Sequence, residues 1–390
     1  MEAFAGNASF VMSSNLESIR IGALGAGGFG LFALQQFTQI PGVQLVAMGA
    51  THREAAFAMT QRFGIPDPMD IDKLLARDDI NLVYIATPPF LHHAQAMKAL
   101  QAGKHVICEK PLATDLAQAD EMIGLAHKNN LLVIANLMQR YNRLFDIVRR
   151  VVESKVLGEF LHGFFENYAS DEGLGLQHWF WDRAKSGGIF IEHGVHFFDM
   201  FAGWLGAGEV VAAQRTLRPG GKIEEQVNCT VRYSQGATVN FYHGFTQPGR
   251  MDRQEFRLLF ERGDVTLEEW VPTRARIHAV ADEQGTRQLM ELFPGARLDV
   301  SAVYGGKDRA ASGRHKQLDF YQKLDLTYDP GVEKLHSYGE LLREMLRDQI
   351  DWIHDRSHAR KVTEANGRDS LALAVEANRL AHEFAADRHD

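Results

Sequence analysis

Residues 18–30 have the sequence Ser18-Ile19-Arg20-Ile21-Gly22-Ala23-Leu24-Gly25-Ala26-Gly27-Gly28-Phe29-Gly30. The first half is apolar enough for a buried strand, and the second half has the spacing G-x-G-x-x-G before a run of helix-forming residues. This context predicts a dinucleotide-binding turn, in which Gly25 makes the tight turn, Gly27 lets the backbone approach a pyrophosphate, and Gly30 lets the helix pack on the strand. The phosphates would then lie on free N–H groups at a helix N-terminus, where the helix dipole favours negative charge.

The composition is that of an ordinary globular protein. Of the 390 residues, 45% are hydrophobic and 24% are charged, and this length predicts two or three domains. The formal net charge of −8 argues against a nucleic-acid partner, because such proteins carry a basic surface. The two cysteines, Cys108 and Cys229, are too few for a disulfide framework or a zinc site, which favours the reducing cytoplasm.

Neither a leader peptide nor a membrane segment is expected. Residues 1–17 contain the acidic Glu2 and lack a basic region before an apolar core, so they do not resemble a signal peptide. No apolar run reaches the ~18 residues that a membrane-spanning helix needs, and no membrane partner is expected. We therefore expect residues 1–17 to be an N-terminal extension of a cytoplasmic protein.

The second predicted strand, residues 43–48, bears on the choice of cofactor. In an NAD enzyme an acidic residue usually ends this strand and holds the ribose hydroxyls. Here the strand is followed by Gly49-Ala50-Thr51-His52-Arg53, and the acid is absent. Thr51 and Arg53 could instead hold the 2′-phosphate of NADP. The alternative is that Arg53 is only a solvated residue opening the next helix; we favour NADP over NAD.

A regular alternation of strands and helices follows. The predicted strands are residues 81–86, 105–108 and 131–135, and the predicted helices are residues 52–63, 91–100 and 115–128. The short connections between them predict a doubly wound parallel sheet. Ligands bind outside the carboxyl ends of such strands, which is where Gly25, Thr87 and Lys110 fall.

After Gly158 the pattern changes to alternating strands separated by turn residues. The strand candidates are residues 160–168, 210–217, 226–233, 237–245 and 256–260, and the helix candidates are residues 145–153, 341–354 and 370–384. The strands predict an open, mainly antiparallel sheet with one exposed face, and such a face favours a homodimer or homotetramer. Residues 263–336 are poorly patterned, and we interpret them as sheet periphery plus an insertion.

The whole chain is therefore predicted to be an α/β protein with two main parts. The predicted divisions are an extension over 1–17, a dinucleotide-binding Rossmann domain over 18–140, a substrate and oligomerisation domain over 141–360, and a C-terminal helix over 361–390 that packs back on the Rossmann domain. The sequence contains no internal repeats or low-complexity tracts.

Lys110 lies between Glu109 and Pro111 at the end of a predicted strand. A cation held there can bond a substrate oxygen and the nicotinamide ribose, and it can stabilise negative charge that develops during hydride transfer. The alternative is a surface lysine that pairs with Glu109. Position alone leaves both interpretations open.

The second segment that carries chemistry is Ser186-Gly187-Gly188-Ile189-Phe190-Ile191-Glu192-His193-Gly194-Val195-His196-Phe197-Phe198-Asp199. If a regular helix begins after the glycines, Glu192 and His196 are four residues apart on one face. The carboxylate could then orient the imidazole and raise its basicity, and His196 could exchange a proton with an alcohol as hydride leaves or arrives. Glu192, His193 and His196 are also possible metal ligands, but the HExxH spacing is missing and we expect no metal.

The candidate substrate contacts are His193, Arg140, His178, Trp181 and Arg183. Trp181, with its neighbours Trp179 and Phe180, could stack on a sugar ring or could be a core aromatic. His178 and Arg183 flank these aromatic residues and could contact hydroxyl groups.

Four motifs occur in a consistent order and spacing over residues 18–205. They are the glycine turn, Ala86-Thr87-Pro88-Pro89 with His92, Ala102-Gly103-Lys104-His105-Val106-Ile107-Cys108-Glu109-Lys110-Pro111-Leu112, and Gly187-Gly188 followed by Glu192, Gly194, His196 and Asp199. In combination they resemble the glucose–fructose oxidoreductase/inositol dehydrogenase family (Gfo/Idh/MocA). The rest of the chain is compatible with that family in its pattern only.

The resemblance implies an N-terminal Rossmann domain, a C-terminal α/β domain with an open antiparallel sheet, and NAD(P)-dependent chemistry at a sugar or polyol carbon. By motif position, Lys110 matches the family's catalytic lysine and His196 its catalytic histidine. Glu192 falls where the family usually has aspartate, so this third catalytic residue keeps the carboxylate with a longer reach. The cofactor contacts predicted in this way are Gly25, Gly27, Gly28, Phe29, Gly30, Thr51, Arg53, Thr87, Pro88, His92, Glu109 and Lys110.

The predicted function is hydride transfer between NADP or NAD and a secondary hydroxyl or keto carbon of a sugar, polyol or sugar derivative. One alternative retains tightly bound NAD and cleaves a glycosidic bond, or isomerises the sugar, without net redox change. Another alternative is a dinucleotide-binding regulator without catalysis, against which the pair Lys110 and His196 argues.

Overall fold

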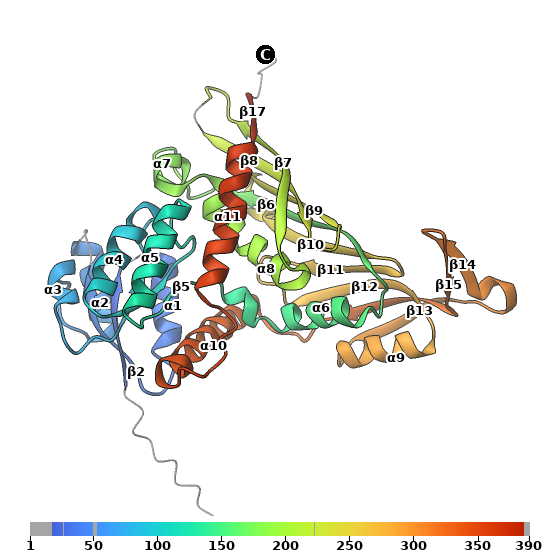
Figure 1. The fold of residues 1–390 in the computed structure, drawn as a ribbon, viewed down its shortest axis with the longest axis horizontal. Coiled ribbons are helices and arrows are strands. Elements are labelled where there is room, and N and C mark those ends of the chain that lie inside the picture. The colour runs from blue at the N-terminus through green and yellow to red at the C-terminus, as the bar shows by residue number, and fades with distance from the viewer. Residues whose placement is uncertain (1–17, 26, 50–52, 222, 386–390) are drawn as a thin grey trace, which may run out of the picture.

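The computed structural model describes residues 18–25, 27–49, 53–221 and 223–385. Two large sheets organise these residues (Figure 1): a five-stranded sheet near the N-terminus and a ten-stranded sheet built from the later part of the chain. Helix α11 (Glu364–Leu380) lies between the two sheets.

The N-terminal sheet has the strand order β2-β1-β3-β4-β5, with parallel pairing throughout. Its strands are β1 (Ile19–Leu24), β2 (Val43–Gly49), β3 (Leu82–Ile85), β4 (His105–Cys108) and β5 (Val133–Ala135). Its helices are α1 (Gly28–Phe37), α2 (Arg53–Phe63), α3 (Ile71–Leu75), α4 (His92–Gln101) and α5 (Leu116–Lys128). The predicted doubly wound parallel sheet is confirmed, and residues such as Val106 and Ile107 are fully buried because helices cover both faces.

The strand order reverses between β1 and β3, which places the crevice of this sheet beside Gly25. Gly25 has a φ of +98°, and a Cβ there would come within 2.5 Å of the carbonyl oxygen of Ala86, so only glycine fits the turn. A Cβ on Gly30 would lie 2.7 Å from that of Ala86. The two glycines therefore make the tight turn and the close packing of α1 that the sequence predicts.

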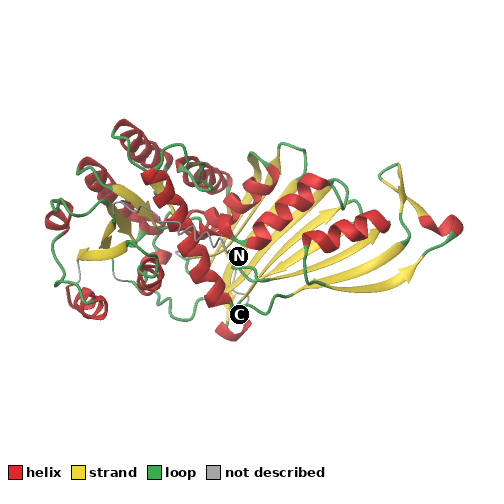
Figure 2. Ribbon diagram, turned by 90° about the horizontal axis from the view of Figure 1, so that it is seen from below, coloured by secondary structure: helices red, strands yellow, loops and turns green. Residues whose placement is uncertain are grey.

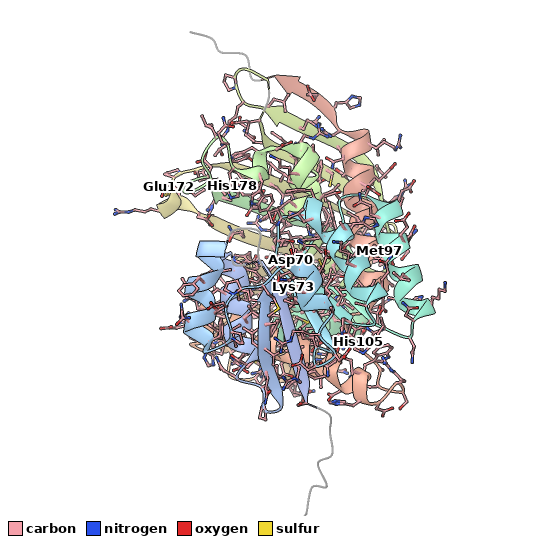
Figure 3. The ribbon with its side chains drawn as sticks, turned by 90° about the vertical axis from the view of Figure 1, so that its left-hand side faces the viewer. Asp70, Lys73, Met97, His105, Glu172 and His178 are labelled. Atoms are coloured by element: carbon pink, nitrogen blue, oxygen red, sulfur yellow. The ribbon has the colours of Figure 1, made fainter. Side chains whose placement is uncertain are left out.

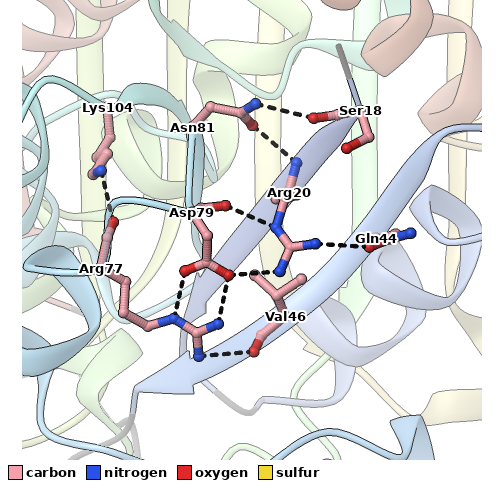
Figure 4. Close-up of polar contacts among 8 residues, drawn as sticks. All are labelled: Ser18, Arg20, Gln44, Val46, Arg77, Asp79, Asn81 and Lys104. Atoms are coloured by element: carbon pink, nitrogen blue, oxygen red, sulfur yellow. Dashed lines mark hydrogen bonds and ion pairs between the residues drawn. The ribbon is translucent and has the colours of Figure 1, made fainter.

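The opposite, amino end of this sheet is held by a charged network (Figure 4). Arg20 on β1 and Arg77 both bind Oδ2 of Asp79, at 2.5 and 2.8 Å. Hydrogen bonds from Arg77 and Arg20 hold the pKa of the Asp79 carboxyl below its usual value. Asn81 accepts from the backbone N–H of Arg20 at 2.9 Å and donates to the carbonyl of Ser18 at 3.1 Å. This network joins strand ends on the side away from the glycine turn.

The second sheet has the strand order β13-β16-β12-β11-β10-β6-β9-β8-β7-β17. Its strands are β6 (Phe160–Ser170), β7 (Gly208–Leu217), β8 (Glu224–Tyr233), β9 (Thr238–Gln247), β10 (Arg253–Phe260), β11 (Gly263–Glu268), β12 (Arg274–Ala281), β13 (Arg297–Val303), β16 (Gln322–Tyr328) and β17 (His382–Ala385). Most neighbours pair antiparallel, whereas β6 with β9 and β7 with β17 pair in parallel. The predicted open, mainly antiparallel sheet is confirmed.

Residues 263–336 contribute more to this sheet than their weak pattern indicated. Strands β11, β12, β13 and β16 all come from this segment and extend the sheet on one side. A hairpin of β14 (Ala310–Gly313) and β15 (Lys316–Asp319) projects beyond the sheet at the right of Figure 1. The segment is therefore sheet plus an inserted hairpin.

Helices cover one face of the second sheet (Figure 2). They include α6 (Arg143–Ser154), α8 (Val195–Leu205) and α9 (Glu283–Leu292). In the part of the chain that the structure describes, no helix covers the other face. Two apolar side chains there, Phe164 and Leu259, are 36% and 43% exposed.

The last two helices differ from the predicted ranges. Helix α10 (Lys334–His354) begins earlier than residue 341 and packs on α1. The predicted helix over 370–384 is wrong at both ends, because α11 begins at Glu364 after the capping residue Thr363, and residues 382–385 form strand β17. Helix α11 contacts α5 and β5 of the first sheet, and it also contacts α8 and β7 of the second part. The division into domains stays a prediction.

Candidate active site

A cavity of about 550 Å³ lies at the carboxyl ends of the first sheet, where it meets residues of the second part of the chain. The predicted site residues that line it are Gly25, Gly27, Gly28, Phe29, Gly30, Thr87, Pro88, Glu109, Lys110, Glu192 and His178. Figure 3 views the molecule from the left-hand side of Figure 1 and labels His178 and Asp70, the residue that precedes α3. Segments far apart in the sequence thus share one cavity.

The glycine turn leaves room for a phosphate. Helix α1 begins at Gly28 with Gly27 as its N-cap, and no side chain caps its first N–H groups. A Cβ on Gly27 or Gly28 would meet no atom within 4 Å, so both residues face open space. Free N–H groups at a helix N-terminus favour an anion. The residues present therefore fit the pyrophosphate of a dinucleotide.

His92, a predicted cofactor contact, lies behind the cavity wall. It is fully buried, and its two ring nitrogens lie 2.8 Å from the carbonyl oxygen of Pro111 and 2.7 Å from that of Thr87. Burial lowers the pKa of His92. Because one carbonyl follows Lys110 and the other belongs to the turn after β3, His92 positions two segments of the cavity relative to each other.

Two further cofactor predictions cannot be placed on the cavity. Thr51 lies outside the described residues, and Arg53 is described only through its backbone, at the start of α2. The predicted contacts with a 2′-phosphate therefore stay predictions.

Lys110 is held by Glu192. Its Nζ donates to Oε1 of Glu192 at 2.5 Å and to the backbone carbonyl of Glu192 at 2.6 Å. The neighbouring Glu109 instead accepts from the hydroxyl of Tyr84 at 2.5 Å and from Nδ2 of Asn136 at 2.9 Å, and burial raises its pKa. The alternative interpretation of Lys110, a surface residue that pairs with Glu109, is therefore wrong.

The segment that carries Glu192 is not a regular helix. It follows two glycines with φ of +82° and +90°, and Phe190–Gly194 form a π-helical turn before α8 begins. A π-turn is wider than an α-turn, so residues four apart no longer lie directly above each other. This corrects the expectation that Glu192 orients His196, because the carboxylate bonds Lys110 instead.

His196 is buried, with 8% of its surface exposed, and its Nδ1 has no hydrogen-bond partner. Burial, and then the nearby charge of Lys110, lower the pKa of His196 to about 3. The sequence predicts two opposed influences on this pKa, a rise through Glu192 and a fall through Lys110, and of the two only the fall is found. The ring is therefore neutral near pH 7, which is the form that can accept a proton.

A pair of histidines, His193 and His243, lies beside these residues, and only His193 was a candidate from the sequence. His193, which the sequence suggests only as a substrate contact, has its Nδ1 3.0 Å from Nδ1 of His243 on β9. Burial lowers the pKa of His193 well below its ordinary value, and His243 and Lys110 add to the shift. No local motif marks His243, because strand pairing in the second sheet brings it to this place.

The aromatic candidates divide between core and cavity. Trp181 is 6% exposed, and its indole N–H donates to the carbonyl of Leu174 at 3.1 Å, so it is a core aromatic. Trp179 and His178 line the cavity, with ring centroids 5.1 Å apart. His178 therefore keeps its candidate role, and Trp179, rather than Trp181, is the tryptophan that lines the cavity.

The two candidate arginines support the segment around Glu192 from behind. Arg140 binds both carboxylate oxygens of Asp199 on α8 at 2.7 Å. Arg183 is the first residue of α7 (Arg183–Ser186), and its Nε lies 3.9 Å from the carboxylate of Glu224. Glu224 is 3% exposed and accepts from the backbone N–H of Ile189 at 2.6 Å. This buried carboxylate, which the sequence pattern did not reveal, holds the start of the π-helical turn.

Among the described residues, no group of three or more His, Cys, Asp or Glu side chains is placed to hold a metal ion. Nor does that part of the chain contain a helix long and apolar enough to cross a membrane. Cys108 and Cys229 are buried free thiols, and burial raises the pKa of both.

Two family models match the chain. The oxidoreductase family with an NAD-binding Rossmann fold matches residues 19–137, and the GFO/IDH/MocA C-terminal domain matches residues 145–266. A dTDP-3,4-didehydro-2,6-dideoxy-alpha-D-glucose 3-reductase from Saccharopolyspora spinosa is 33% identical over 142 residues, which are 36% of this chain and 43% of the relative. A glycosyl hydrolase family 109 protein from Shewanella sp. (strain W3-18-1) is 27% identical over 205 residues, which are 47% of this chain and 44% of the relative. The chain thus matches less than half the length of these curated relatives.

The fold has a solved counterpart. KijD10, a 3-ketoreductase from Actinomadura kijaniata in complex with NADP and TDP-benzene, aligns with a TM-score of 0.73 and 19% identity, over 95% of this chain and 100% of that one. At this identity the likeness concerns the fold alone. The two family models carry the assignment further, because together they include both the glycine turn and the segment of Glu192 and His196. The chain belongs to the Gfo/Idh/MocA family of oxidoreductases.

Proposed function

We propose that this chain is an NAD(P)-dependent oxidoreductase that transfers hydride to or from a secondary hydroxyl or keto carbon of a sugar, polyol or sugar derivative. One observation carries the proposal: the Lys110–Glu192 pair lies on the same cavity as the glycine turn. A cation held beside a dinucleotide site can stabilise negative charge on a substrate oxygen. Family membership and the reductase among the relatives support the same class of reaction.

Three residues share the proposed chemistry. The nicotinamide ring, when bound, accepts or supplies the hydride. His196 exchanges the hydroxyl proton, in the neutral form that its lowered pKa maintains near pH 7. Lys110 donates a hydrogen bond to the reacting oxygen, and Glu192 holds the ammonium group of Lys110 through two hydrogen bonds.

The wall of the cavity supports a carbohydrate-like substrate. Trp179 and His178 offer ring surfaces there, and Lys110 and Glu192 offer polar groups. A sugar combines apolar C–H faces with hydroxyl groups, so it matches a pocket that is largely apolar with a few placed polar groups.

NADP is the proposed cofactor in preference to NAD. Strand β2 ends at Gly49, and the next residue is Ala50, where an NAD enzyme usually has an acid. Thr51 and Arg53 follow as the proposed contacts with the 2′-phosphate. The binding of NADP in the crystal structure of KijD10 supports this choice.

A second candidate function involves no net redox change. Tightly bound NAD would oxidise the sugar transiently, and a glycosidic bond would then be cleaved or the sugar isomerised. The glycosyl hydrolase family 109 relatives favour this alternative. A non-catalytic regulator is the third candidate, but binding alone would not require an ammonium group held beside a histidine.

The test begins with the absorbance spectrum of the purified protein, which reports retained cofactor. The absorbance of reduced nicotinamide is then followed with NADP or NAD and a panel of myo-inositol, aldohexoses, dTDP-glucose and p-nitrophenyl glycosides. A change in reduced nicotinamide that Lys110→Ala abolishes supports the oxidoreductase. Release of p-nitrophenol without net cofactor change supports the second candidate, and cofactor binding without either reaction contradicts both.

A further inference from the structure

The backbone that leads into the π-helical turn is held from outside the cavity. Nδ2 of Asn378 donates to the carbonyl of Gly187 at 2.8 Å. Oε1 of Glu224 accepts from the N–H of Ile189 at 2.6 Å. Neither Asn378 nor Glu224 lines the cavity. These two side chains therefore fix, from behind, the two peptide groups that flank Gly188.

Gly188 leaves room for both side chains. Its φ is +90°, and a Cβ there would lie 3.1 Å from Oε1 of Glu224 and 3.6 Å from Oδ1 of Asn378. The carbonyl of Gly188 accepts from the backbone N–H of Glu192 at 2.9 Å. Glu192 in turn holds Nζ of Lys110 through its carbonyl and Oε1. The fixed peptide groups are thus one hydrogen bond away from the residue that holds the ammonium group.

Glu224 is a buried carboxylate whose charge and hydrogen bond have different partners. Its Oε2 lies 3.7 Å from Nε of Arg215 and 3.9 Å from Nε of Arg183, and both distances are too long for hydrogen bonds. The two guanidinium groups offset the charge of a residue that is 3% exposed. Its hydrogen bond goes to the N–H of Ile189. The charge of Glu224 therefore bears on stability, and its Oε1 bears on the turn.

Asn378 lies on α11, which also touches the segment of Lys110. A Cβ on Gly367 of α11 would lie 3.4 Å from that of Leu112, which follows Lys110 and Pro111 in the sequence. From Gly367 to Asn378 the helix rises about 16 Å, at about 1.5 Å per residue. Helix α11 is therefore a spacer between the strand end that carries Lys110 and the π-helical turn.

We propose that Asn378 and Glu224 are positioning residues for the Lys110–Glu192 pair, through the two peptide groups that they fix. The part of that pair in hydride transfer rests on the proposed function, whereas its geometry does not. Loss of either hydrogen bond lets the π-helical turn move relative to the end of β4. The contact between Nζ of Lys110 and Oε1 of Glu192 is then no longer fixed, although every residue of the cavity is still present.

The first test reads the pair without substrate or cofactor. The full chain is labelled briefly with acetic anhydride, and mass spectrometry follows the acetylation of Lys110 relative to that of Lys98, whose side chain is 54% exposed. Glu192→Gln frees the ammonium group and gives the rate for a lysine that is not held. We expect Asn378→Ala and Glu224→Ala to raise the rate at Lys110 toward that value, because the turn no longer keeps the pair together.

Each variant has a matched control. Arg379→Ala changes the next residue of α11, whose side chain is 66% exposed, and Glu209→Ala removes the carboxylate of an exposed ion pair between β7 and β8. Both should leave the labelling of Lys110 unchanged. A parent-like rate in Asn378→Ala overturns the proposal, and so does one in a folded Glu224→Ala. If Glu224→Ala does not fold, Asn378→Ala decides alone.

The second test separates positioning from stability, with NADP and the most active sugar or polyol of the panel. Asn378→Ala should lower kcat by about tenfold or more, since a misplacement of about 1 Å costs that much or more. It should change the free energy of unfolding little, because alanine favours a helix. Glu224→Gln should do the reverse: its amide oxygen can still accept from Ile189, whereas Arg215 loses the nearby charge.

The two variants therefore distinguish positioning from a merely structural role. A kcat that follows the free energy of unfolding in both would overturn the proposal. In the presence of Lys110→Ala, Asn378→Ala should have little further effect on kcat, and an undiminished effect would also overturn it. If the parent chain acts on no probe, the proposed function fails, and the labelling of Lys110 still decides whether Asn378 and Glu224 position the pair.

Discussion

The Nζ of Lys110 lies 2.5 Å from Oε1 of Glu192 and 2.6 Å from the carbonyl oxygen of the same residue. One side chain thereby joins the end of β4 to the π-helical turn that precedes α8. The two side chains are 19% and 12% exposed, so removal of either partner leaves the other as an unpaired charge that is largely shielded from solvent. The geometry of the candidate site therefore depends on both residues together.

The first prediction is that Lys110 and Glu192 act as a unit. Glu192→Gln should lower kcat/KM because it frees the ammonium group, and it should have little further effect when Lys110→Ala is already present. The coupling energy should be about 1–3 kcal/mol, as for residues in direct contact. Steady-state kinetics of the four proteins measures it. Glu121→Gln, which removes an exposed carboxylate 2.8 Å from His93, is the control and should be additive with Lys110→Ala. Additive effects of the first pair would contradict the prediction.

The second prediction is that Gly25 and Gly28, two glycines of the same turn, have different roles, the first in stability and the second in cofactor binding. Gly25→Ala should lower the free energy of unfolding by about 1–3 kcal/mol, because of its φ of +98° and the carbonyl of Ala86. Gly28→Ala should leave that free energy unchanged or slightly higher, since a helix favours alanine over glycine. Its methyl group would enter the open space at the helix start, so the dissociation constant for NADP should rise about tenfold or more. Urea unfolding measures the stability of the two variants, and titration with NADP measures their affinity for the cofactor. Equal free energies of unfolding for Gly25→Ala and Gly28→Ala would contradict the prediction.

The third prediction concerns stability at acid pH. Burial lowers the folded-state pKa of His196 and His243 to about 3 and that of His105 to about 4, against roughly 6.5 in the unfolded chain. Between these values the unfolded chain binds more protons than the folded one, so stability is full above about pH 6.5 and is lost as the pH falls. Urea unfolding should give a lower free energy at about pH 5 than at about pH 7, with a shallower slope for His243→Asn. A free energy of unfolding that does not change between these two pH values would contradict the prediction that these buried histidines are neutral in the folded chain.

The features that could be predicted from the sequence are local. The glycine turn is marked by its own spacing, because the positive φ of Gly25 and the close approach of Gly30 to Ala86 both require glycine, and that spacing is visible in the sequence. The position of Lys110 follows from a short buried strand and its end. The hydrophobic period of α11 indicated a helix but not its ends, because its first turn is set by the cap at Thr363 and its last residues are captured by pairing of β17 with β7.

The features that could not be predicted depend on distant partners. A π-turn over Phe190–Gly194 leaves no mark in periodicity, so the spacing of Glu192 and His196 suggested a contact that does not form. The low pKa of His196 follows first from burial, which the local pattern does not reveal, and only second from Lys110, whose effect the sequence predicts. His243 reaches His193 only because β9 pairs with β6 inside the second sheet.

The fourth prediction concerns cofactor choice. NADP should bind more tightly than NAD, because Ala50 stands where a carboxylate would hold the ribose hydroxyls and Arg53 follows it. Ala50→Asp should reverse the preference by placing a negative charge against the 2′-phosphate. Dissociation constants for both dinucleotides, measured with the parent chain, Ala50→Asp and the neutral control Ala50→Asn, test this. Tighter binding of NAD by the parent chain would refute it.

The last prediction is that the chain forms a homodimer or homotetramer through the uncovered face of the second sheet. Phe164 and Leu259 are 36% and 43% exposed there, on the neighbouring strands β6 and β10. An extended apolar face is seldom left in water by a monomer, and a second copy presents the same face for a symmetric contact. Light scattering at micromolar concentration should therefore give a multiple of the chain mass. Leu259→Lys should shift it toward the monomer, because a buried lysine would lack a partner, whereas Leu335→Lys, at an exposed position on α10, should not. A monomeric mass for the parent chain would refute the assembly, and dissociation by Leu335→Lys alone would place the contact on α10.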